Sequence, residues 1–360
     1  MPARVPASEF ADDLLAWWYD HGRKDLPWQK DPTPYRVWVS EIMLQQTQVA
    51  SVERYFDVFI EAFPTVRQLA SADQDQVLHR WSGLGYYARA RNLHRAAAVV
   101  CERHDGELPG ELDALMALPG IGRSTAGAIL ALSMNRAAPI LDGNAKRVLA
   151  RVFGITGWPG ESAVARKLWA IAEECTPQEQ AAQYTQAIMD LGATLCVRRN
   201  PQCERCPFDD RCVASRKDCV HSIPGSRPRR DRPERSMVLA LVVREDDGAV
   251  LLERRPPEGI WGGLWGFPEL ESVEVARAWC REQVGHTPRA VEVTEIVRHS
   301  FTHFELNMTP VRLRVRIADD LIRDSRLSPD RWLWYKRDRP AEVGLAAPVA
   351  RLLANEGEIR

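Results

Sequence analysis

The sequence predicts a multidomain chain in which an all-α region is followed by a smaller α+β domain. Up to residue 212, apolar residues recur at the spacing of amphipathic helices, and no stretch alternates strongly enough to require a sheet. From residue 237, short runs of β-branched and apolar residues bounded by turn residues are typical of strands. With 360 residues, the chain is long enough for two domains.

The composition is that of a globular protein, with 45% hydrophobic and 27% charged residues. A formal net charge of −1 argues against a uniformly basic nucleic-acid binder, although a local basic groove is enough to contact phosphates. No apolar run approaches the roughly 20 residues that span a bilayer, and residues 1–9 lack the features of a signal peptide. We therefore expect no membrane partner and a cytoplasmic location.

Helical periodicity is the main pattern of the first region. It predicts two helices within 37–63 and further helices at 10–21, 66–82, 88–104, 112–118, 124–134, 145–153, 163–175 and 179–191. Glu41 lies on the first helix of 37–63, one turn after Trp38 and one turn before Gln45. A lone helical carboxylate is most often solvated, so its position alone assigns it no role.

The segment 118–144 contains a glycine turn followed by a turn carboxylate. Gly120 and Gly122 are separated by one residue, which permits backbone conformations that a Cβ would forbid, and a helix is predicted to follow. The free N–H groups and the dipole of such a helix favour an anion, for which a nucleic-acid phosphate is a candidate. Asp142 then stands at the start of the next helix. Alternatively, the turn only joins two packed helices and Asp142 is an N-cap.

Four cysteines lie within seventeen residues, with the spacing C-x6-C-x2-C-x5-C. They are Cys196, Cys203, Cys206 and Cys212. Because disulfides are rare in a reducing compartment, four close thiols indicate a metal site. Zinc usually has two separated C-x2-C pairs, and four thiolates also suit an iron–sulfur cluster, so spacing decides only weakly between them. The arginines interleaved with these cysteines suggest a basic surface: Arg198, Arg199, Arg205 and Arg211.

The composition changes after residue 212. Residues 216–235 hold seven Lys or Arg against three acids, with three prolines, which is typical of a stiff basic linker. Such a linker either lies along the nucleic acid or the domain surface, or is a purely solvated connector. Strands are then predicted at 237–244, 249–254, 292–299 and 308–317, and a helix at 273–284. We therefore divide the chain into 1–212, with the hairpin at 118–134 and the cysteine loop at 196–212, a linker at 213–235, and a C-terminal domain at 236–360.

The glycine hairpin, the following helix and Asp142 together resemble the helix-hairpin-helix DNA glycosylases. In that family the same cysteine spacing directly follows the catalytic domain and holds one [4Fe-4S] cluster, so the resemblance implies this cofactor. The C-terminal domain resembles the Nudix fold, with Gly263, Glu269 and Arg277 in register with its motif. Ala278 and Arg281 replace two of its acids, and Mg²⁺ needs clustered oxygen ligands, so we expect nucleotide recognition without hydrolysis.

This order of domains resembles the MutY family of adenine-specific mismatch glycosylases over nearly the whole chain. The most specific segments are 38–49, 83–90 and 141–144. The resemblance implies hydrolysis of the N-glycosidic bond of adenine mispaired with 8-oxoguanine or guanine. Glu41 would protonate adenine because apolar surroundings raise a carboxyl pKa. Asp142 would stabilise the oxocarbenium ion, and Asn144 would orient Asp142 or the water.

The same resemblance implies the DNA contacts. Trp28, Gln29, Leu44, Val49 and Gln186 would line the adenine pocket, and Gly120 and Gly122 would face phosphate. Gln46 and Tyr86 would fill the gap left by the extruded base, and Thr47 would contact 8-oxoguanine. The loop Phe301-Thr302-His303 would read 8-oxoguanine. Trp261 and Trp265 are expected to be domain core. Ser124 stands where lyase-type relatives carry lysine, so we expect a monofunctional glycosylase.

Three hypotheses therefore compete. The first is a monomeric adenine glycosylase that acts on double-stranded DNA near the nucleoid. The second is a pyrimidine-lesion glycosylase-lyase, against which Ser124 and the C-terminal domain argue. The third is a non-catalytic iron–sulfur protein that senses DNA damage, against which the presence of Glu41 and Asp142 argues.

Overall fold

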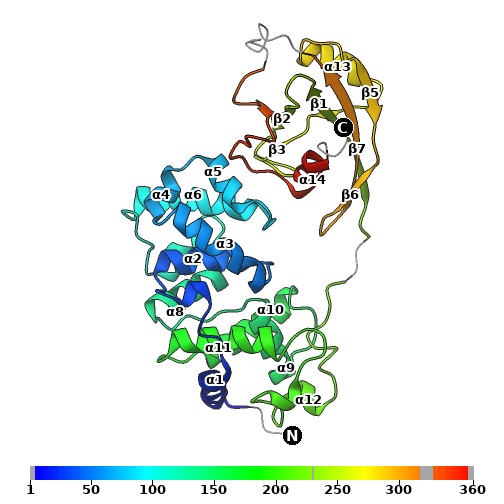
Figure 1. Cartoon of the computed structure of the whole chain (residues 1–360). Helices are drawn as coiled ribbons and strands as arrows, with labels where there is room; N and C mark the ends of the chain where they lie inside the picture. Colours follow the sequence, from blue (N-terminus) through cyan, green and yellow to red (C-terminus); the bar gives the residue numbers. More distant parts are fainter. Residues whose placement is uncertain (1–4, 229–230, 317–326, 356–360) are drawn as a thin grey trace. The chain divides into compact units, whose positions relative to one another are not determined.

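The computed structural model describes residues 5–228, 231–316 and 327–355, and the chain divides into two compact units (Figure 1). The first unit comprises residues 1–71 and 92–229. The second comprises residues 72–91 and 230–360, so a short helical segment belongs with the C-terminal domain. Among the described residues, no helix has the length and apolar character needed to cross a membrane.

Among its described residues, the first unit contains helices and no strand, as the sequence predicts. Its first helices are α1 (Ala7–His21), η1 (Pro27–Gln29), α2 (Pro34–Leu44), α3 (Val49–Ala62) and α4 (Val66–Ser71). Its later helices are α7 (Leu112–Met116), α8 (Arg123–Met134), α9 (Gly143–Phe153), α10 (Ser162–Cys175), α11 (Ala181–Thr194), η2 (Cys203–Arg205) and α12 (Val213–Arg216). Helix α6 (Ala88–Arg103) begins in the second unit and continues into the first.

The hairpin between α7 and α8 requires glycine. Gly120 has φ +80°, and a Cβ there would lie 2.8 Å from Cβ of Asn92. Both the backbone conformation and the close approach exclude larger residues. Gly122 is the N-cap of α8, which confirms the predicted turn into a helix.

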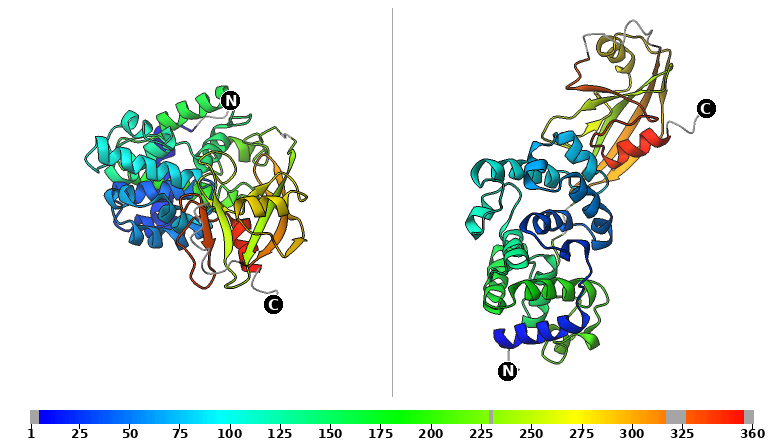
Figure 2. Two further views of the ribbon diagram at one scale, coloured as in Figure 1. Left: turned by 90° about the horizontal axis from the view of Figure 1, so that it is seen from above. Right: turned by 60° about the vertical axis from the view of Figure 1, so that its left-hand side comes forward.

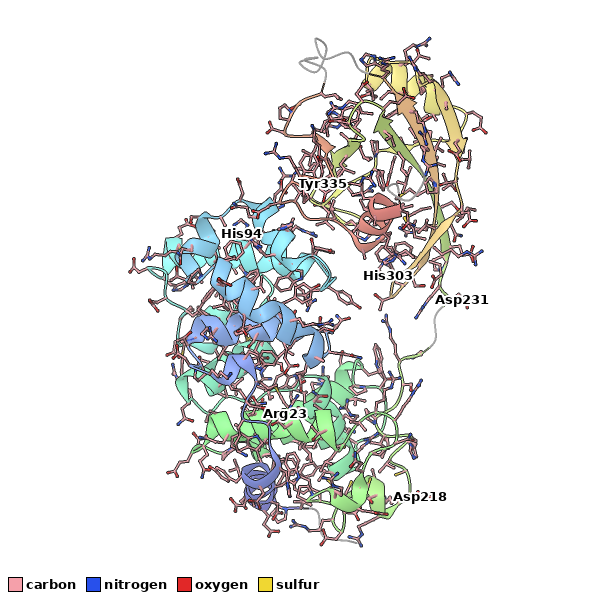
Figure 3. The ribbon with its side chains drawn as sticks, in the orientation of Figure 1. Arg23, His94, Asp218, Asp231, His303 and Tyr335 are labelled. Atoms are coloured by element: carbon pink, nitrogen blue, oxygen red, sulfur yellow. The ribbon has the colours of Figure 1, made fainter. Side chains whose placement is uncertain are left out.

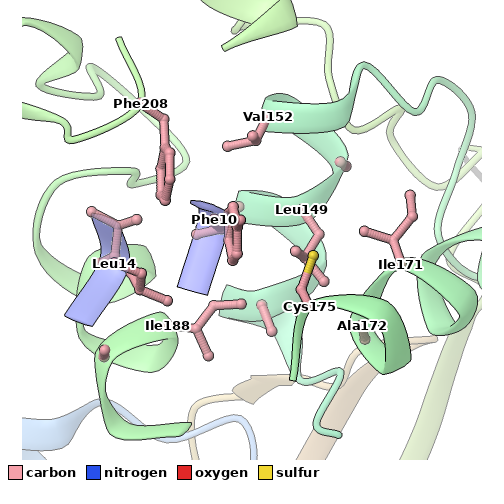
Figure 4. Close-up of a cluster of buried hydrophobic side chains, with 14 of the residues drawn as sticks. Phe10, Leu14, Leu149, Val152, Ile171, Ala172, Cys175, Ile188 and Phe208 are labelled. Carbon is pink, nitrogen blue, oxygen red and sulfur yellow. The ribbon is translucent and has the colours of Figure 1, made fainter. Parts of the chain in front are cut away.

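A buried cluster fastens the cysteine loop to the helices (Figure 4). Phe10 of α1 stacks on Phe208 with ring centroids 4.5 Å apart and an interplanar angle of 6°. Leu149 of α9 and Ile188 of α11 belong to the same cluster and are fully buried or nearly so. The hydrophobic burial of α1, α9 and α11 therefore also fixes residue 208, which lies between two of the cysteines.

The second unit contains a mixed sheet in the order β3-β2-β1-β7-β5, with β4 paired to β1, β6 to β7 and β8 to β2. The strands are β1 (Glu234–Arg244), β2 (Val250–Arg254), β3 (Trp265–Gly266), β4 (Glu269–Leu270), β5 (Ala290–Val293), β6 (Val297–Ser300), β7 (Glu305–Val315) and β8 (Trp332–Tyr335). Its helices are α5 (Gln74–Trp81), α13 (Ala276–Gln283) and α14 (Ala347–Asn355). Figure 2 shows α14 beside the strands.

Strand β1 has buried side chains on both faces of this sheet. Ala240 and Val242 pack in the same cluster as Cys280 of α13. Leu239 and Leu241 are equally buried and point to the other face, because successive side chains of a strand alternate. A Cβ added to Gly266 would lie 3.7 Å from Cγ2 of Val349 in α14, so α14 packs against the sheet at β3.

Two predicted elements are split in the structure. The predicted helix 66–82 is broken into α4 and α5, because Asp73 adopts an extended conformation and forms a capping box with Gln76. The predicted strand 292–299 is divided into β5 and β6. Both pair with β7, but Pro310 of β7 lies between the two pairings and has no N–H to donate. Ile317, the end of the predicted last strand, and part of the linker (229–230) lie outside the described residues.

Candidate active site and cysteine centre

A cavity of about 440 Å³ in the first unit collects most of the predicted site residues. The end of α2, the residues before α3, and the N-termini of α8 and α9 contribute to it, as does α11. The predicted residues that line it are Trp28, Glu41, Leu44, Gln46, Thr47, Val49, Ser124, Asp142, Asn144 and Gln186. Arg23 and Lys146 also line it, and sequence reasoning did not single them out.

Glu41 is held in its neutral form by its surroundings. Burial raises the pKa of its carboxyl to about 8, and the negative charge of Asp142 adds to the increase. The helix around it is apolar, with Trp38 and Met43 fully buried. A carboxyl with this pKa still carries its proton at neutral pH and can donate it.

Asp142 is both an N-cap and a wall of the cavity. Its Oδ1 accepts a hydrogen bond of 2.8 Å from the N–H of Ala145, at the start of α9. The alternative that Asp142 is an N-cap is therefore correct, and this structural role is compatible with a chemical role. The capping bond fixes the carboxylate, so it faces the cavity without having to reorganise.

Ser124 supports the backbone that leads to Asp142. Its Oγ accepts a hydrogen bond of 2.9 Å from the N–H of Leu141. The hydroxyl is thus bonded to the residue that precedes Asp142, and Ser124 and Asp142 line the same cavity. A Schiff base requires a primary amine, and Ser124 supplies only a hydroxyl at this position.

Asn144 is joined to the cysteine loop by one arginine. Arg147 donates to Oδ1 of Asn144 at 2.8 Å and to the carbonyl of Cys196 at 2.7 Å. It also donates to the carbonyl of Gly192 at 2.6 Å. Burial lowers the pKa of this guanidinium, and the cysteine Cys196 acts against that change. Sequence reasoning missed Arg147, because a basic residue in the first turns of an amphipathic helix is usually solvated.

A buried carboxylate orients Gln186. Asp190 is fully buried and accepts from Nε2 of Gln186 at 2.9 Å and from the guanidinium of Arg23 at 2.6 and 2.8 Å. Because a carboxylate only accepts, this contact assigns the amide nitrogen of Gln186 to Asp190. Arg23 is labelled in Figure 3. An aspartate inside the apolar run 187–191 was the available indication of this network in the sequence.

Gln29 does not line the cavity with Glu41. Its Oε1 accepts from the N–H of Leu26 at 3.1 Å, and its Nε2 donates to the carbonyl of Arg23 at 3.0 Å. These bonds use its amide to close the turn of η1. Gln29 lines a separate cavity of about 300 Å³, and Trp28 and Gln186 contribute to both cavities.

The residues predicted to fill the DNA gap belong to different units. Gln46, in the first unit, is exposed and has φ +58°. Tyr86, in the second unit, is 47% exposed and has φ +48°. A tyrosine that only capped a turn inside the core would be buried, so the exposure of Tyr86 argues against a purely structural role in the core.

The predicted 8-oxoguanine loop forms the turn between β6 and β7. Thr302 and His303 are exposed at its tip, and His303 is labelled in Figure 3. Phe301 stacks on the buried Phe304, with ring centroids 4.4 Å apart. Trp261 lies 5.6 Å from the ring of Phe301 and is only partly buried, so the expectation that it is core is wrong.

Trp265 and the Nudix-like helix agree with the sequence analysis. Trp265 is 5% exposed, as expected for a core residue. Glu269 forms an ion pair with Arg255, and Arg277 donates to the carbonyl of Pro288 at 3.1 Å. Ala278 and Arg281 are exposed on α13. Glu269 and Arg277, which match the Nudix motif, are thus engaged within the domain.

The four predicted cysteine ligands surround one cavity. Cys196, Cys203, Cys206 and Cys212 all line it, and none is in a disulfide. Arg151 donates to Sγ of Cys196 at 3.3 Å. Within the described residues, no three His, Cys, Asp or Glu side chains are arranged to hold a single metal ion. Four thiols around one cavity are a donor set that suits an iron–sulfur cluster or a zinc ion.

The arginines of the cysteine loop divide into two groups. Arg211 forms ion pairs with Glu9 and Asp13 of α1, so it adds little to the basic surface that the sequence suggests. Arg198 and Arg199 instead line a basic depression of about 780 Å³. The other basic residues lining that depression are Lys146, Arg147, Arg151, His221 and Arg227.

Comparison with known proteins identifies both parts of the chain. Residues 39–174 match the HhH-GPD superfamily of base excision DNA repair proteins, and residues 239–355 match the NUDIX domain. A solved thermostable thymine-DNA glycosylase is 26% identical, with a TM-score of 0.52 over 58% of this chain and 95% of that one. A structure of an endonuclease III–DNA complex is 22% identical, with a TM-score of 0.50 over 58% of this chain and 94% of that one, and shows the same helical fold.

Relatives that match along most of this chain identify its family more specifically. The chain is 36% identical to an adenine DNA glycosylase of Buchnera aphidicola (subspecies Acyrthosiphon pisum), covering 96% of this chain and 97% of the relative. It is 33% identical to the adenine DNA glycosylase of Homo sapiens, covering 82% of this chain and 65% of the relative. The predicted helical glycosylase domain and Nudix-like domain are therefore confirmed. This chain belongs to the adenine DNA glycosylase family.

Proposed function

We propose that the protein is a monofunctional glycosylase that removes adenine mispaired with 8-oxoguanine or guanine in double-stranded DNA. The observation that carries this proposal is the pair of carboxyl groups in one cavity, with Glu41 neutral because of burial and the charge of Asp142. Excision needs both an acid for the base and an anion for the sugar, and this pair offers each.

The reaction would proceed with Glu41 as general acid. Its proton passes to N7 of the extruded adenine while the bond between C1′ and N9 breaks, and the bonding electrons leave with the base. Asp142 stabilises the positive charge on the sugar, as an ion-pair partner or a transient nucleophile. Water then supplies its oxygen to C1′, and a carboxylate of the pair takes the water proton. Asn144, held by Arg147, orients Asp142 or the water.

Ser124 favours hydrolysis over strand cleavage. A lyase step requires an amine that forms a Schiff base with C1′, and the Ser124 hydroxyl is engaged with the backbone of Leu141. A pyrimidine-lesion glycosylase-lyase therefore lacks its nucleophile at this position. A non-catalytic damage sensor would have no need for a carboxyl whose pKa is raised to about 8.

We infer that the four cysteines hold one [4Fe-4S] cluster, which would supply a rigid cross-link for the loop 196–212. Support comes from four thiols that surround one cavity. Arg151 and Arg147, which contact Cys196, would help to orient the loop. The basic depression beside this loop is suited to the phosphates of the duplex.

Recognition of the opposite strand would use side chains that are exposed or half-buried. Thr302 and His303 offer a hydroxyl and an imidazole at the tip of a turn that Phe301 and Phe304 stiffen by stacking. Tyr86 and Gln46 would fill the space left by the extruded nucleotide, and Thr47 would contact 8-oxoguanine. We expect the enzyme to act as a monomer.

A single-turnover assay tests this proposal. Duplexes carrying adenine opposite 8-oxoguanine, guanine or cytosine are incubated with the protein, and abasic sites are revealed by alkali. We expect fast excision for the first two and slow excision for the third. Glu41→Gln should retain duplex binding and lose excision, whereas the exposed Glu53→Gln of α3 should match the original protein. Equal excision by both variants would remove Glu41 from the mechanism.

A further inference from the structure

The turn that carries Tyr86 has an unusual backbone. It joins α5, which ends at Trp81, to α6, which begins at Ala88. Gly83 has φ +104°, Gly85 has φ +72° and Tyr86 has φ +48°. A left-handed conformation is costly for a tyrosine, and it persists only where the surroundings impose it.

Two side chains of the flanking helices hold the turn from within. Nε1 of Trp81 donates to the carbonyl of Gly85 at 3.1 Å. The guanidinium of Arg89 donates to the same carbonyl at 3.1 Å and lies 5.5 Å from the ring centroid of Tyr86. Both contacts therefore fix the carbonyl of Gly85, while Tyr86 remains 47% exposed.

The C-terminal domain holds the turn from the other side. The hydroxyl of Tyr87 donates to the carbonyl of Leu345 at 2.7 Å and accepts from the N–H of Gly83 at 3.4 Å. Oγ of Ser82 accepts from the N–H of Leu345 at 3.4 Å. Both backbone groups of Leu345 are thus bonded to residues that bracket the Tyr86 turn.

Leu345 is itself anchored in the sheet of the second unit. It forms a bridge with Trp265 of β3, and the N–H of Trp265 donates to the carbonyl of Gly344 at 2.9 Å. A Cβ on Gly344 would lie 2.6 Å from Cβ of Leu78, so only glycine allows this approach to α5.

Further bonds fasten the helices on either side of the turn. The carboxylate of Asp75 on α5 accepts from Nε1 of Trp265 at 3.1 Å and from Arg254 of β2 at 3.3 Å. Arg91 on α6 donates to the carbonyl of Gly262 at 2.6 Å. The Tyr86 turn is therefore built into the same compact unit as the Nudix-like sheet.

We propose that Tyr87 and Ser82 are positioning residues, through which the 344–345 segment of the Nudix-like domain holds Tyr86 in its gap-filling conformation. The inference rests on the proposed role of Tyr86. The domain that reads 8-oxoguanine thereby also sets the residue that stabilises the extruded state, so recognition and extrusion share one rigid element.

The test is Tyr87→Phe, which removes one hydroxyl and keeps the ring. We expect extrusion of 2-aminopurine opposite 8-oxoguanine, measured by its fluorescence, to fall about five- to tenfold, the factor that corresponds to one lost hydrogen bond. Excision from that duplex should fall equally, whereas excision of an unpaired adenine in a bulge should change little. A merely structural defect would lower both excision rates together.

Ser82→Ala should give a smaller change in the same direction, and it keeps the test decisive if Tyr87→Phe folds poorly. The matched control is Tyr335→Phe on β8, a tyrosine of the same domain labelled in Figure 3. Unchanged extrusion in Tyr87→Phe and Ser82→Ala would overturn the inference. Tyr86→Ala separates the two hypotheses: if it leaves extrusion intact, the proposed role of Tyr86 fails first.

Discussion

At the scale of single residues, the site depends on giving two carboxyl groups different environments. Glu41 is surrounded by the buried side chains of α2, and this burial opposes ionisation. Asp142 stands at a helix start, where its carboxyl accepts a hydrogen bond from the backbone N–H of Ala145. Two acids in one cavity can then take different roles, one as donor and one as anion.

The raised pKa of Glu41 makes a prediction about stability. The pKa of Glu41 is about 8 in the folded protein and about 4.5 in the unfolded chain. Its contribution to the free energy of unfolding is therefore fully present below about pH 4.5 and is lost as the pH rises towards about 8. Glu41→Gln should therefore gain thermal stability over the original protein across this pH range, with no further gain above it. Thermal melts from pH 5 to 9 check this; a constant difference would contradict the raised pKa.

Ser124→Lys should introduce strand cleavage. The amine would occupy the wall of the cavity beside Asp142, from which it could form a Schiff base with C1′. Borohydride trapping of a covalent protein–DNA adduct is the measurement, and Thr125→Lys at the neighbouring cavity position is the control. Without an adduct in Ser124→Lys, residue 124 would not face the sugar.

At the scale of elements, α9 connects the chemistry to the cysteine loop. Its N-terminus carries Asp142 as the cap, and Arg147 joins Asn144 to Cys196 one turn later. The N-terminal position of Asp142 is predictable from the turn sequence Asp-Gly-Asn. The bonds of Arg147 are not, because their carbonyl partners come from residues 192–196 and are set by tertiary packing.

Arg147→Gln should weaken the loop and the site together. Three partly buried carbonyl and amide acceptors lose a charged donor, which is costly. We expect excision to fall by one to two orders of magnitude and the loop 196–212 to become more sensitive to proteolysis. The exposed Arg166→Gln of α10 is the control. Full activity with a protected loop would show that the Arg147 bonds do not support the site.

The boundaries of some helices and strands could not be predicted from the sequence pattern. Asp73 breaks a continuous apolar periodicity by a capping box, and Pro310 on a neighbouring strand divides β5 from β6. Gln29 was placed at the adenine pocket by its position in a motif, yet it bonds within its own turn. At Asp73 and Gln29 a local hydrogen bond outweighs the pattern, whereas at β5 and β6 the interruption comes from a proline of the partner strand.

At the scale of the whole molecule, each unit carries one part of the proposed task. The first unit holds the cavity with Glu41 and Asp142, and the second holds the 301–303 loop and Tyr86. The helical and Nudix-like folds could be predicted from the sequence, since their motifs are local. That residues 72–91 form one unit with the C-terminal sheet could not, because it depends on contacts such as Tyr87 with Leu345.

His303→Ala should reduce the preference for 8-oxoguanine over guanine and leave excision opposite guanine nearly unchanged. The side chain is exposed, so its loss should cost little stability. The ratio of single-turnover rates on the two duplexes measures the preference, with His286→Ala at a half-buried position of the same domain as control. An unaltered ratio would exclude the loop from 8-oxoguanine recognition.

The pH dependence of the single-turnover rate on adenine opposite 8-oxoguanine tests the proton donor most directly. Because Glu41 must be protonated, the rate should be constant near neutral pH and fall tenfold per pH unit above a pKa of about 8. A rate that instead falls above pH 4–5, or that stays constant to pH 10, would show that Glu41 does not deliver the proton.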